Sequence, residues 1–209
     1  MATTANSKAE SDDRRAEYFV KPEQVEEMRN ATVAESAGYL SQRNDAIIQV
    51  LYDTGLRVGE LVALNVDMVD LDEEVFRLPP HIQKQPPQGS GPNPVTMRLA
   101  GETARVLRQY LNTRWKDSEA LFPSRQAARM TTESVRNVVS RAAEAAEVNP
   151  YTMGGRGEPA DVSPHTLRHS VAWRMMNREE GNSLYDVRNR LRHSSISTTE
   201  EVYDHWEEV

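Results

Sequence analysis

The sequence predicts a mainly α-helical domain with a small three-stranded antiparallel β-sheet. Three observations lead to this prediction. Apolar residues recur at helical spacing through most of the chain, an alternating pattern with turn residues is confined to residues 66–99, and no internal repeat or long linker divides the 209 residues. We expect residues 1–18 to form a disordered arm and residues 19–209 to form one domain.

The first helices are marked by their start and stop residues. Pro22 suits the first position of a helix, and apolar residues follow it at helical spacing. Ser41 is expected to cap a second helix, which ends near Gly55. A short third helix is expected over residues 57–64.

The sheet is predicted from three short apolar runs at residues 66–69, 75–78 and 95–99. Acidic residues at 70–74 and a Pro/Gly cluster at 86–92 separate these runs. Beyond the sheet we expect helices at 103–115 and 131–146, then a Gly- and Pro-rich loop at 149–159. Ser163 and Pro164 should open a helix that runs to about residue 178. Ser183 should start the next helix, and Ser197 or Thr198 should cap the last.

Composition excludes some classes of protein and favours others. The chain has no cysteine, which removes disulfides, thiolate catalysis and cysteine-bound zinc. It shows no bilayer-length apolar run and no secretory signal, so we expect a cytoplasmic protein that does not bind membranes. The net charge is −7, yet residues 76–195 carry 18 Lys and Arg against 11 Asp and Glu. This basic middle indicates a polyanionic partner.

The stretch SPHTLRHS, residues 163–170, combines groups suited to phosphate chemistry. His165, Arg168 and His169 are spaced three and four apart, so they can lie near one face at a helix N-terminus. The free N–H groups and the dipole of a helix N-terminus favour an anion. Arginine adds a bidentate fork, and histidine adds a proton donor or acceptor near neutral pH. The sequence therefore predicts a phosphate site with an acid/base group.

Three segments together resemble the conserved boxes of the tyrosine recombinase, or phage integrase, family. They are TGLRVGEL (54–61), SPHTLRHS (163–170) and LRHSSISTTEEVYDHW (191–206). They occur in the order typical of the family, with a β-hairpin between the first and second, and the similarity covers about residues 20–206. One box would be weak support, but three in order, ending in a tyrosine ten residues after a histidine, are specific.

The resemblance implies a role for each matching residue. Arg57 and Arg168 would hold the non-bridging oxygens of the scissile phosphate and stabilise the transition state. His165 would act as an acid/base group, and His193 would hydrogen-bond the phosphate. Tyr203 would attack phosphorus, form a 3′-phosphotyrosyl link and free a 5′-hydroxyl. The covalent link retains the energy of the broken bond, so no metal, ATP or other cofactor is expected.

Two positions depart from the family pattern. The family uses a hairpin lysine to protonate the leaving oxygen, and Lys84 is the only lysine between residues 22 and 115. Prolines flank Lys84, where the family usually has Gly-Lys-Gly. Arg192 stands in place of the glycine in the family's Leu-Gly-His. We expect Arg192 either to be strained, if a positive φ is needed, or to contact DNA.

The resemblance also predicts the partners. Recombination needs four active sites on two duplexes, so we expect double-stranded DNA, a homo-tetramer on DNA and a monomer when free. Many family members carry an N-terminal domain that clamps the DNA, which is expected to be absent because only about 20 residues precede the first catalytic helix. Trp206 is the residue after Tyr203 that is expected to anchor a contact with a neighbouring subunit.

Surface arginines at helical spacing are expected to contact the DNA backbone, which positions DNA without reading its sequence. The helical basic set is Arg105, Arg108, Arg125, Arg129, Arg136 and Arg141. The sites expected to bind DNA are Arg129, Arg136, Arg141 and Arg192. A simple solvated face is the alternative interpretation, and the entry of the helix at 131–146 into the major groove is a further hypothesis.

Three other functions stay open from the sequence. One is a type IB topoisomerase-like enzyme, and another is a catalytically inactive DNA-binding accessory protein. The third is a zinc site of His165, His169 and His193, against which the H-E-x-x-H pattern is missing and Arg168 would lie beside the cation. His169 is otherwise expected to be a buried residue that orients a neighbour, and Glu60 to be structural.

Overall fold

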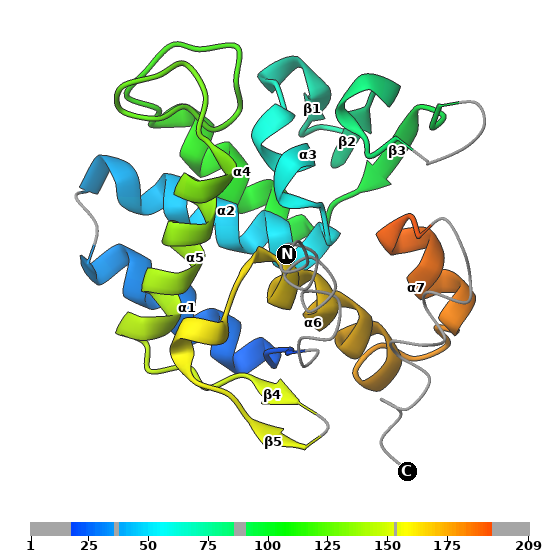
Figure 1. The fold of residues 1–209 in the computed structure, drawn as a ribbon. Helices are drawn as coiled ribbons and strands as arrows, with labels where there is room; N and C mark the ends of the chain where they lie inside the picture. Colours follow the sequence, from blue (N-terminus) through cyan, green and yellow to red (C-terminus); the bar gives the residue numbers. More distant parts are fainter. Residues whose placement is uncertain (1–17, 36–37, 86–90, 153, 194–209) are drawn as a thin grey trace, which may run out of the picture.

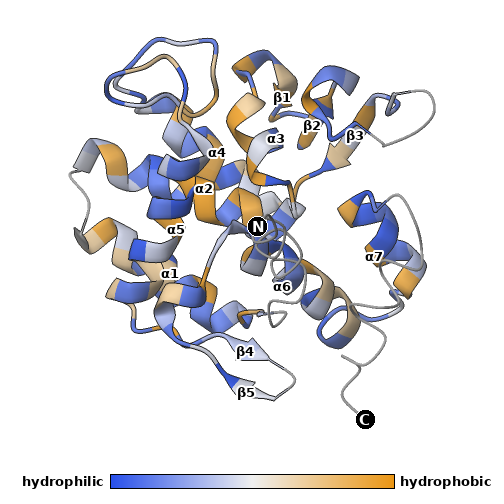
Figure 2. Cartoon of the chain, viewed as in Figure 1, coloured by the Kyte–Doolittle hydropathy of each residue, from blue (hydrophilic) through white to orange (hydrophobic). Residues whose placement is uncertain are grey.

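The computed structural model of the chain describes residues 18–35, 38–85, 91–152 and 154–193. The central element is α2 (Gly38–Thr54), which packs against α1 (Pro22–Glu35), α4 (Gly101–Asn112), α5 (Thr132–Ala145) and α6 (Pro164–Asn177) (Figure 1). The C-terminal half of α2 is buried along an unbroken run of residues. Apolar residues therefore gather where α2 crosses the centre of the domain, whereas the hairpin at the lower edge is hydrophilic (Figure 2).

The predicted three-stranded antiparallel sheet is confirmed. Its strands are β1 (Val69–Asp70), β2 (Val75–Leu78) and β3 (Val95–Arg98), in the order β1-β2-β3. Phe76 pairs with Met97 in the β2–β3 register, and both side chains are buried in the core. The short helix α3 (Val58–Ala63) and the 3₁₀ turn η3 (Pro80–Ile82) pack together beside this sheet.

The predicted first strand at 66–69 is mostly wrong. Val66–Met68 form a 3₁₀ turn, η2, and only Val69 of that run belongs to β1. The reason is a competing pairing of the preceding chain. Val66 N donates to the carbonyl of Glu119, and Leu121 N donates to the carbonyl of Leu64, both at 2.9 Å. The backbone here therefore bonds to residues 119–121.

Helix starts were predicted with mixed success. Pro22 opens α1, Ser163 caps α6, and Ser183 caps α7 (Leu184–Leu191), as expected. Ser41 is not a cap, because α2 begins at Gly38 and the Ser41 hydroxyl donates to the Gly38 carbonyl at 2.8 Å inside the first turn.

A small hairpin occupies the segment 149–159, which the sequence predicted to be a loop. It consists of β4 (Tyr151–Thr152) and β5 (Gly155–Arg156). Tyr151 also forms a bridge with Phe19, with backbone bonds of 3.0 and 2.8 Å in the two directions. The Phe19 ring stacks between Tyr151 and Trp173, at centroid distances of 5.6 and 5.2 Å. This contact from distant sequence stabilises strands that have little local signal.

Gly55, just after α2, allows close packing of the last two described helices. Its φ of +63° is left-handed, which favours glycine. A Cβ atom at this position would lie 2.5 Å from Leu191 Cδ2 and 3.5 Å from Val171 Cγ2. A side chain here would therefore clash with Leu191 of α7, which would have to shift, whereas Val171 of α6 would stay at ordinary contact distance.

Every helix in the described ranges is too short or too polar to cross a membrane.

Candidate active site

A cavity of about 260 Å³ brings together the first two of the three boxes. Arg57 comes from the N-terminus of α3, and His165 and Arg168 come from the first turns of α6. The complete lining is Leu56, Arg57, Val58, Arg136, Ser163, Pro164, His165 and Arg168. Arg57 thus shares one surface with His165 and Arg168, which are far from it in sequence, as the resemblance implies.

Arg168 is held by backbone carbonyls on two sides. It is only 3% exposed. Its Nη1 donates to the carbonyl of Gly55, and its Nη2 donates to the carbonyl of Leu191. These bonds fix the plane of the guanidinium, which also lines the cavity. A charged group held in this way is preorganised for an anion because it needs little reorganisation when the anion binds.

Arg57 is positioned by a buried carboxylate that it shares with Arg192. Glu60 is 2% exposed and accepts from the backbone N of Arg57 at 2.8 Å and from its Nη1 at 3.3 Å. Arg192 Nη2 also donates to Glu60. The Arg192 carbonyl in turn accepts from Arg57 Nη2 at 3.4 Å. Glu60 thus has a structural role, as expected, because its carboxylate bridges the guanidinium groups of Arg57 and Arg192.

Arg192 adopts the left-handed conformation that the sequence presented as one possibility. It follows α7 with φ 54° and ψ 48°. For a residue other than glycine this costs on the order of 1 kcal/mol. The side chain offsets part of the cost, since it pairs with Glu60 and lies 3.7 Å from Met97 Sδ. In contrast to the expected DNA contact, the guanidinium thus pairs within the protein.

The histidines around the cavity are held in their neutral forms. Burial, together with Arg168 and Arg57, lowers the pKa of His193 to about 3. Partial desolvation lowers the pKa of His165, and the same two arginines add to this effect. Burial places the pKa of His169 well below its ordinary value, and its ring meets that of His165 edge-on at 4.2 Å. Arg57, Arg168 and Arg192 therefore supply the positive charge, while the imidazoles can accept or donate a proton.

The C-terminal end of α2 anchors the helices that carry these groups. Arg174 donates to the carbonyls of Tyr52 and Asp53, at 3.2 and 3.4 Å. Arg190 donates to the Asp53 carbonyl and carboxylate, both at 2.8 Å, and to the Arg98 carbonyl. Cations are favoured at a helix C-terminus. These contacts, which sequence reasoning missed, tie α6 and α7 to the central helix.

Other predicted site residues lie elsewhere. Arg129 is half-buried and donates to the carbonyls of Val62 and Leu64 at the end of α3, at 2.6 and 3.0 Å. Its expected contact with DNA stays a prediction. Lys84 is exposed in the loop between η3 and β3. Tyr203, Trp206 and the predicted cap at Ser197 or Thr198 lie outside the described residues.

The zinc alternative gains no support from the geometry. Within the parts of the chain that the structure describes, no three His, Asp or Glu side chains are grouped so that they could hold one metal ion. That includes His165, His169 and His193. The arginines Arg57 and Arg168 that lower the pKa values of His165 and His193 make the surroundings favourable to an anion.

Comparison with known proteins places the chain in a family. The profile of the phage integrase family matches residues 18–208. Tyrosine recombinase XerC of Herpetosiphon aurantiacus is 33% identical over 188 residues, which are 87% of this chain and 54% of that protein. Tyrosine recombinase XerD of Pseudomonas putida is 32% identical over 174 residues, covering 79% of this chain and 50% of that protein. The chain spans about half the length of these curated relatives.

Solved structures show the same fold. The crystal structure of XerA recombinase has a TM-score of 0.69 at 25% identity, covering 90% of this chain and 58% of that one. XerH site-specific recombinase bound to difH substrate has a TM-score of 0.67 at 22% identity, covering 90% and 50%. The profile match extends over nearly the whole chain and these folds agree with it, so the chain belongs to the phage integrase family, as its three boxes predicted.

Proposed function

We propose that the chain carries out site-specific DNA recombination, cleaving and rejoining strands through a 3′-phosphotyrosyl intermediate on Tyr203. The observation that carries this proposal is the convergence of Arg57, His165 and Arg168 on one cavity. The relatives named tyrosine recombinase support it, as does XerH, whose structure was solved on its difH substrate. Because those proteins are about twice as long as the matched region, the reaction of this chain is the proposal to be tested.

The two arginines would bind the scissile phosphate and the charge that develops on it. A guanidinium offers several N–H donors in a plane that suits two phosphate oxygens. Arg168 is fixed by the carbonyls of Gly55 and Leu191, and Arg57 is fixed by Glu60. Donors held in place before the substrate arrives stabilise a pentacoordinate transition state more than mobile donors do.

The neutral histidines suit the proton transfers. As Tyr203 attacks phosphorus, its phenolic proton must leave, and a neutral imidazole such as His165 can accept it. His193 would donate a hydrogen bond to a phosphate oxygen. The oxygen of the leaving strand must gain a proton to become the 5′-hydroxyl, and Lys84 is proposed as the donor. Rejoining reverses these steps with a new 5′-hydroxyl.

We further propose that four copies assemble on two duplexes, because two strands must be exchanged between two DNA molecules. The chain would act on double-stranded DNA, with Arg136 at the edge of the cavity contacting the backbone. Arg136 is exposed and lines the cavity beside His165. Its ion pair with Glu133 is long, at 3.4 Å, and exposed, so a phosphate could replace the carboxylate at little cost.

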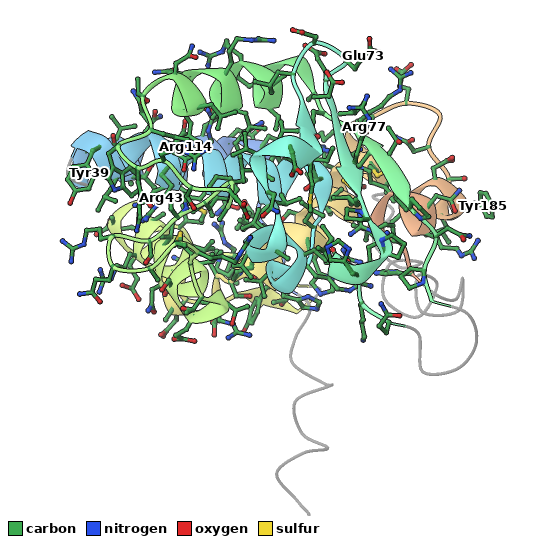
Figure 3. The ribbon with its side chains drawn as sticks, turned by 90° about the horizontal axis from the view of Figure 1, so that it is seen from above. Tyr39, Arg43, Glu73, Arg77, Arg114 and Tyr185 are labelled. Carbon is green, nitrogen blue, oxygen red and sulfur yellow. The ribbon has the colours of Figure 1, made fainter. Side chains whose placement is uncertain are left out.

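A suicide substrate tests the nucleophile. Duplexes bound by the chain are first selected from a random pool, then nicked close to the cleavage position so that the short fragment diffuses away. Denaturing electrophoresis should show a covalent protein–DNA adduct for the wild type and none for Tyr203→Phe. Tyr185→Phe is the matched control, because Tyr185 is 59% exposed on α7 and lies at the edge of the molecule (Figure 3).

Two outcomes would contradict the proposal. An adduct that persists in Tyr203→Phe would assign the nucleophile to another residue. Relaxation of supercoiled DNA without any preferred sequence and without exchange between duplexes would instead indicate a topoisomerase.

A further inference from the structure

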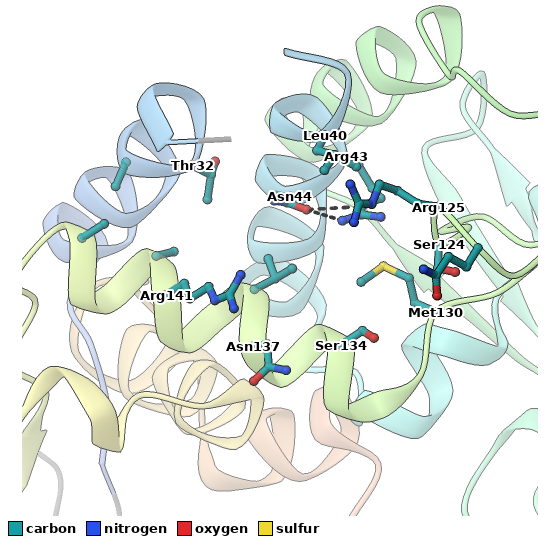
Figure 4. Close-up of a pocket in the computed structure, with 15 residues that line it drawn as sticks. Thr32, Leu40, Arg43, Asn44, Ser124, Arg125, Met130, Ser134, Asn137 and Arg141 are labelled. Atoms are coloured by element: carbon teal, nitrogen blue, oxygen red, sulfur yellow. Dashed lines mark hydrogen bonds between the residues drawn. The ribbon is translucent and has the colours of Figure 1, made fainter. Parts of the chain in front are cut away.

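A second and larger cavity lies between α1, α2, α5 and the segment 124–130, away from the residues assigned to catalysis. Its volume is about 580 Å³. Arg43 of α2, Arg125 of the segment and Arg141 of α5 all line it (Figure 4). Among its lining residues that the structure describes, none is acidic. A concave surface with three guanidinium groups and no lining carboxylate favours an anion.

Arg43 forms a fixed base for this cavity. It is only 6% exposed. Its Nη1 donates to the Pro123 carbonyl at 3.1 Å, and its Nε and Nη2 donate to Asn44 Oδ1 at 3.2 and 2.9 Å (Figure 4). Both acceptors are neutral, so these bonds satisfy donors without neutralising the charge. Burial lowers the pKa of Arg43, and the nearby Arg125 adds to this effect. A bound anion would offset both the desolvation of the Arg43 charge and its repulsion from Arg125.

Arg125 and Arg141 are arranged differently from Arg43. Both are exposed, and within the described residues neither forms an ion pair with a carboxylate. Figure 4 shows Arg125 beside Arg43 and Arg141 reaching from α5 on the other side of the cavity. Hydroxyl and amide groups of Ser124, Ser134 and Asn137 complete the polar lining. The cavity thus combines one fixed cation with two that can adjust to a ligand.

The position of the cavity on α5 indicates which anion it binds. Val138, Arg141 and Ala145 line it, and at 3.6 residues per turn they lie about half a turn around the helix from Arg136, which lines the active-site cavity. The two cavities therefore flank α5. A helix with its side chains is about 10–12 Å across, and the major groove of B-DNA is about 12 Å wide between its two backbones. Phosphates on the two sides of one groove would meet the two edges of this helix.

We propose that the cavity of Arg43, Arg125 and Arg141 binds a backbone phosphate of duplex DNA, on the strand across the groove from the phosphate in the active-site cavity. This proposal rests on the proposed function, because it takes DNA as the substrate. It names a second anchoring site for that DNA, built from α1, α2 and the segment 124–130 as well as from α5. The site fixes the position of the duplex without reading its sequence.

The test is the salt dependence of DNA binding. Binding of a fluorescent random-sequence duplex is measured by anisotropy over a series of KCl concentrations, in the Tyr203→Phe background so that no cleavage interferes. Each lost phosphate contact should lower the magnitude of the slope of log K against log [KCl] by about 0.9. We expect part of this loss in Arg125→Ala and in Arg141→Ala, and the full loss of about 0.9 in the double variant, because the two arginines share one phosphate.

Matched variants separate charge from structure. Arg77→Ala on β2 should leave the slope unchanged, because Arg77 is exposed but already bonded to Asp70 at 2.7 Å. Arg141→Lys should keep most of the slope because the charge is kept. Circular dichroism on each variant checks the fold. A slope unchanged in folded Arg125→Ala/Arg141→Ala would overturn the proposal.

A second arm distinguishes DNA from other anions. Inorganic phosphate and a poly-glutamate peptide are each titrated into the DNA-free chain by calorimetry. If either binds tightly and loses binding in the double variant while the DNA slope does not change, the cavity serves that other anion and the proposal is wrong. The proposed function is judged separately by the adduct. An adduct without a slope change contradicts only this inference, and a slope change without an adduct contradicts only the catalytic proposal.

Discussion

The two cavities that flank α5 both present arginines, but they hold them in different ways. In the active-site cavity, Arg168 is buried and bonded to two backbone carbonyls, and Arg57 is bonded to the buried Glu60. In the larger cavity, Arg43 is fixed, but Arg125 and Arg141 are exposed and, in the described part of the chain, have no carboxylate partner. The two cavities carry similar positive charge, but their arginines differ in how firmly they are held in place before an anion binds.

This difference teaches which property each site requires. Stabilising a transition state depends on donors held near the reacting atoms, so that small displacements cost large factors in rate. Binding a backbone phosphate needs mainly charge and reach, and a mobile side chain supplies both. Substitutions in the active-site cavity should therefore reduce the reaction rate. Substitutions of Arg125 and Arg141 in the larger cavity should instead reduce the affinity for DNA and its salt dependence.

The largest effect is expected at Arg168. Arg168→Ala removes the phosphate donor and leaves the carbonyls of Gly55 and Leu191 without this donor. Adduct formation at saturating DNA should fall by about a thousandfold or more, with DNA binding weaker but present. Rapid quench of the suicide reaction measures the rate, and circular dichroism checks the fold. Unchanged cleavage would show that the two cavities do not differ in the way we infer.

The next effect tests the shared carboxylate. Glu60→Gln removes the charge that balances Arg57 and Arg192, so both guanidinium groups should lose their fixed positions. We expect a loss of about 10–100-fold in the rate of adduct formation, similar to the loss on removing the partner that orients a catalytic ligand. Glu133→Gln is the matched control, because Glu133 pairs with Arg136 at the same i,i+3 spacing but is exposed. Equal effects in the two variants would contradict a positioning role for Glu60.

The smallest effect is on stability as a function of pH. His193 takes up a proton near pH 6.5 in the unfolded chain and only near pH 3 in the folded chain. The free energy of unfolding should therefore be highest above pH 6.5 and fall as the pH drops toward 3, by at most about 1.4 kcal/mol per pH unit from this group. Urea denaturation between neutral and mildly acidic pH should show a shallower fall in His193→Gln. His81→Gln, which replaces an exposed histidine on η3, is measured alongside as a control for the substitution itself.

Much of the fold could be predicted because its signals are local. Pro22, Ser163 and Ser183 each mark a helix start through the geometry of one turn, and those predictions were correct. The start at Ser41 and the strand at 66–69 were wrong for two different reasons. The Ser41 hydroxyl bonds to a carbonyl within its own helix, and Val66 pairs with residue 119. The second cause depends on contacts between distant segments, which local patterns do not contain.

The site was predictable to the extent that the family boxes preserve it. Arg57, His165 and Arg168 do line one cavity, as expected. The partners that position them were harder to predict. A residue type does not reveal that Arg192 turns inward to Glu60 or that Arg129 donates to the end of α3. The sequence indicated Arg125 and Arg141 as backbone contacts, but it did not show that they share a cavity with Arg43, because the three arginines come from separate elements.

Gly55 links the packing of the fold to the reaction centre in a way that matters for engineering. Its left-handed backbone and lack of a side chain allow α7 to pack closely against it. Its carbonyl accepts a hydrogen bond from Arg168. A substitution at this position should therefore lower thermal stability and catalytic turnover together, so a screen for stability alone could not separate the two effects. Libraries that seek altered activity should therefore keep this glycine.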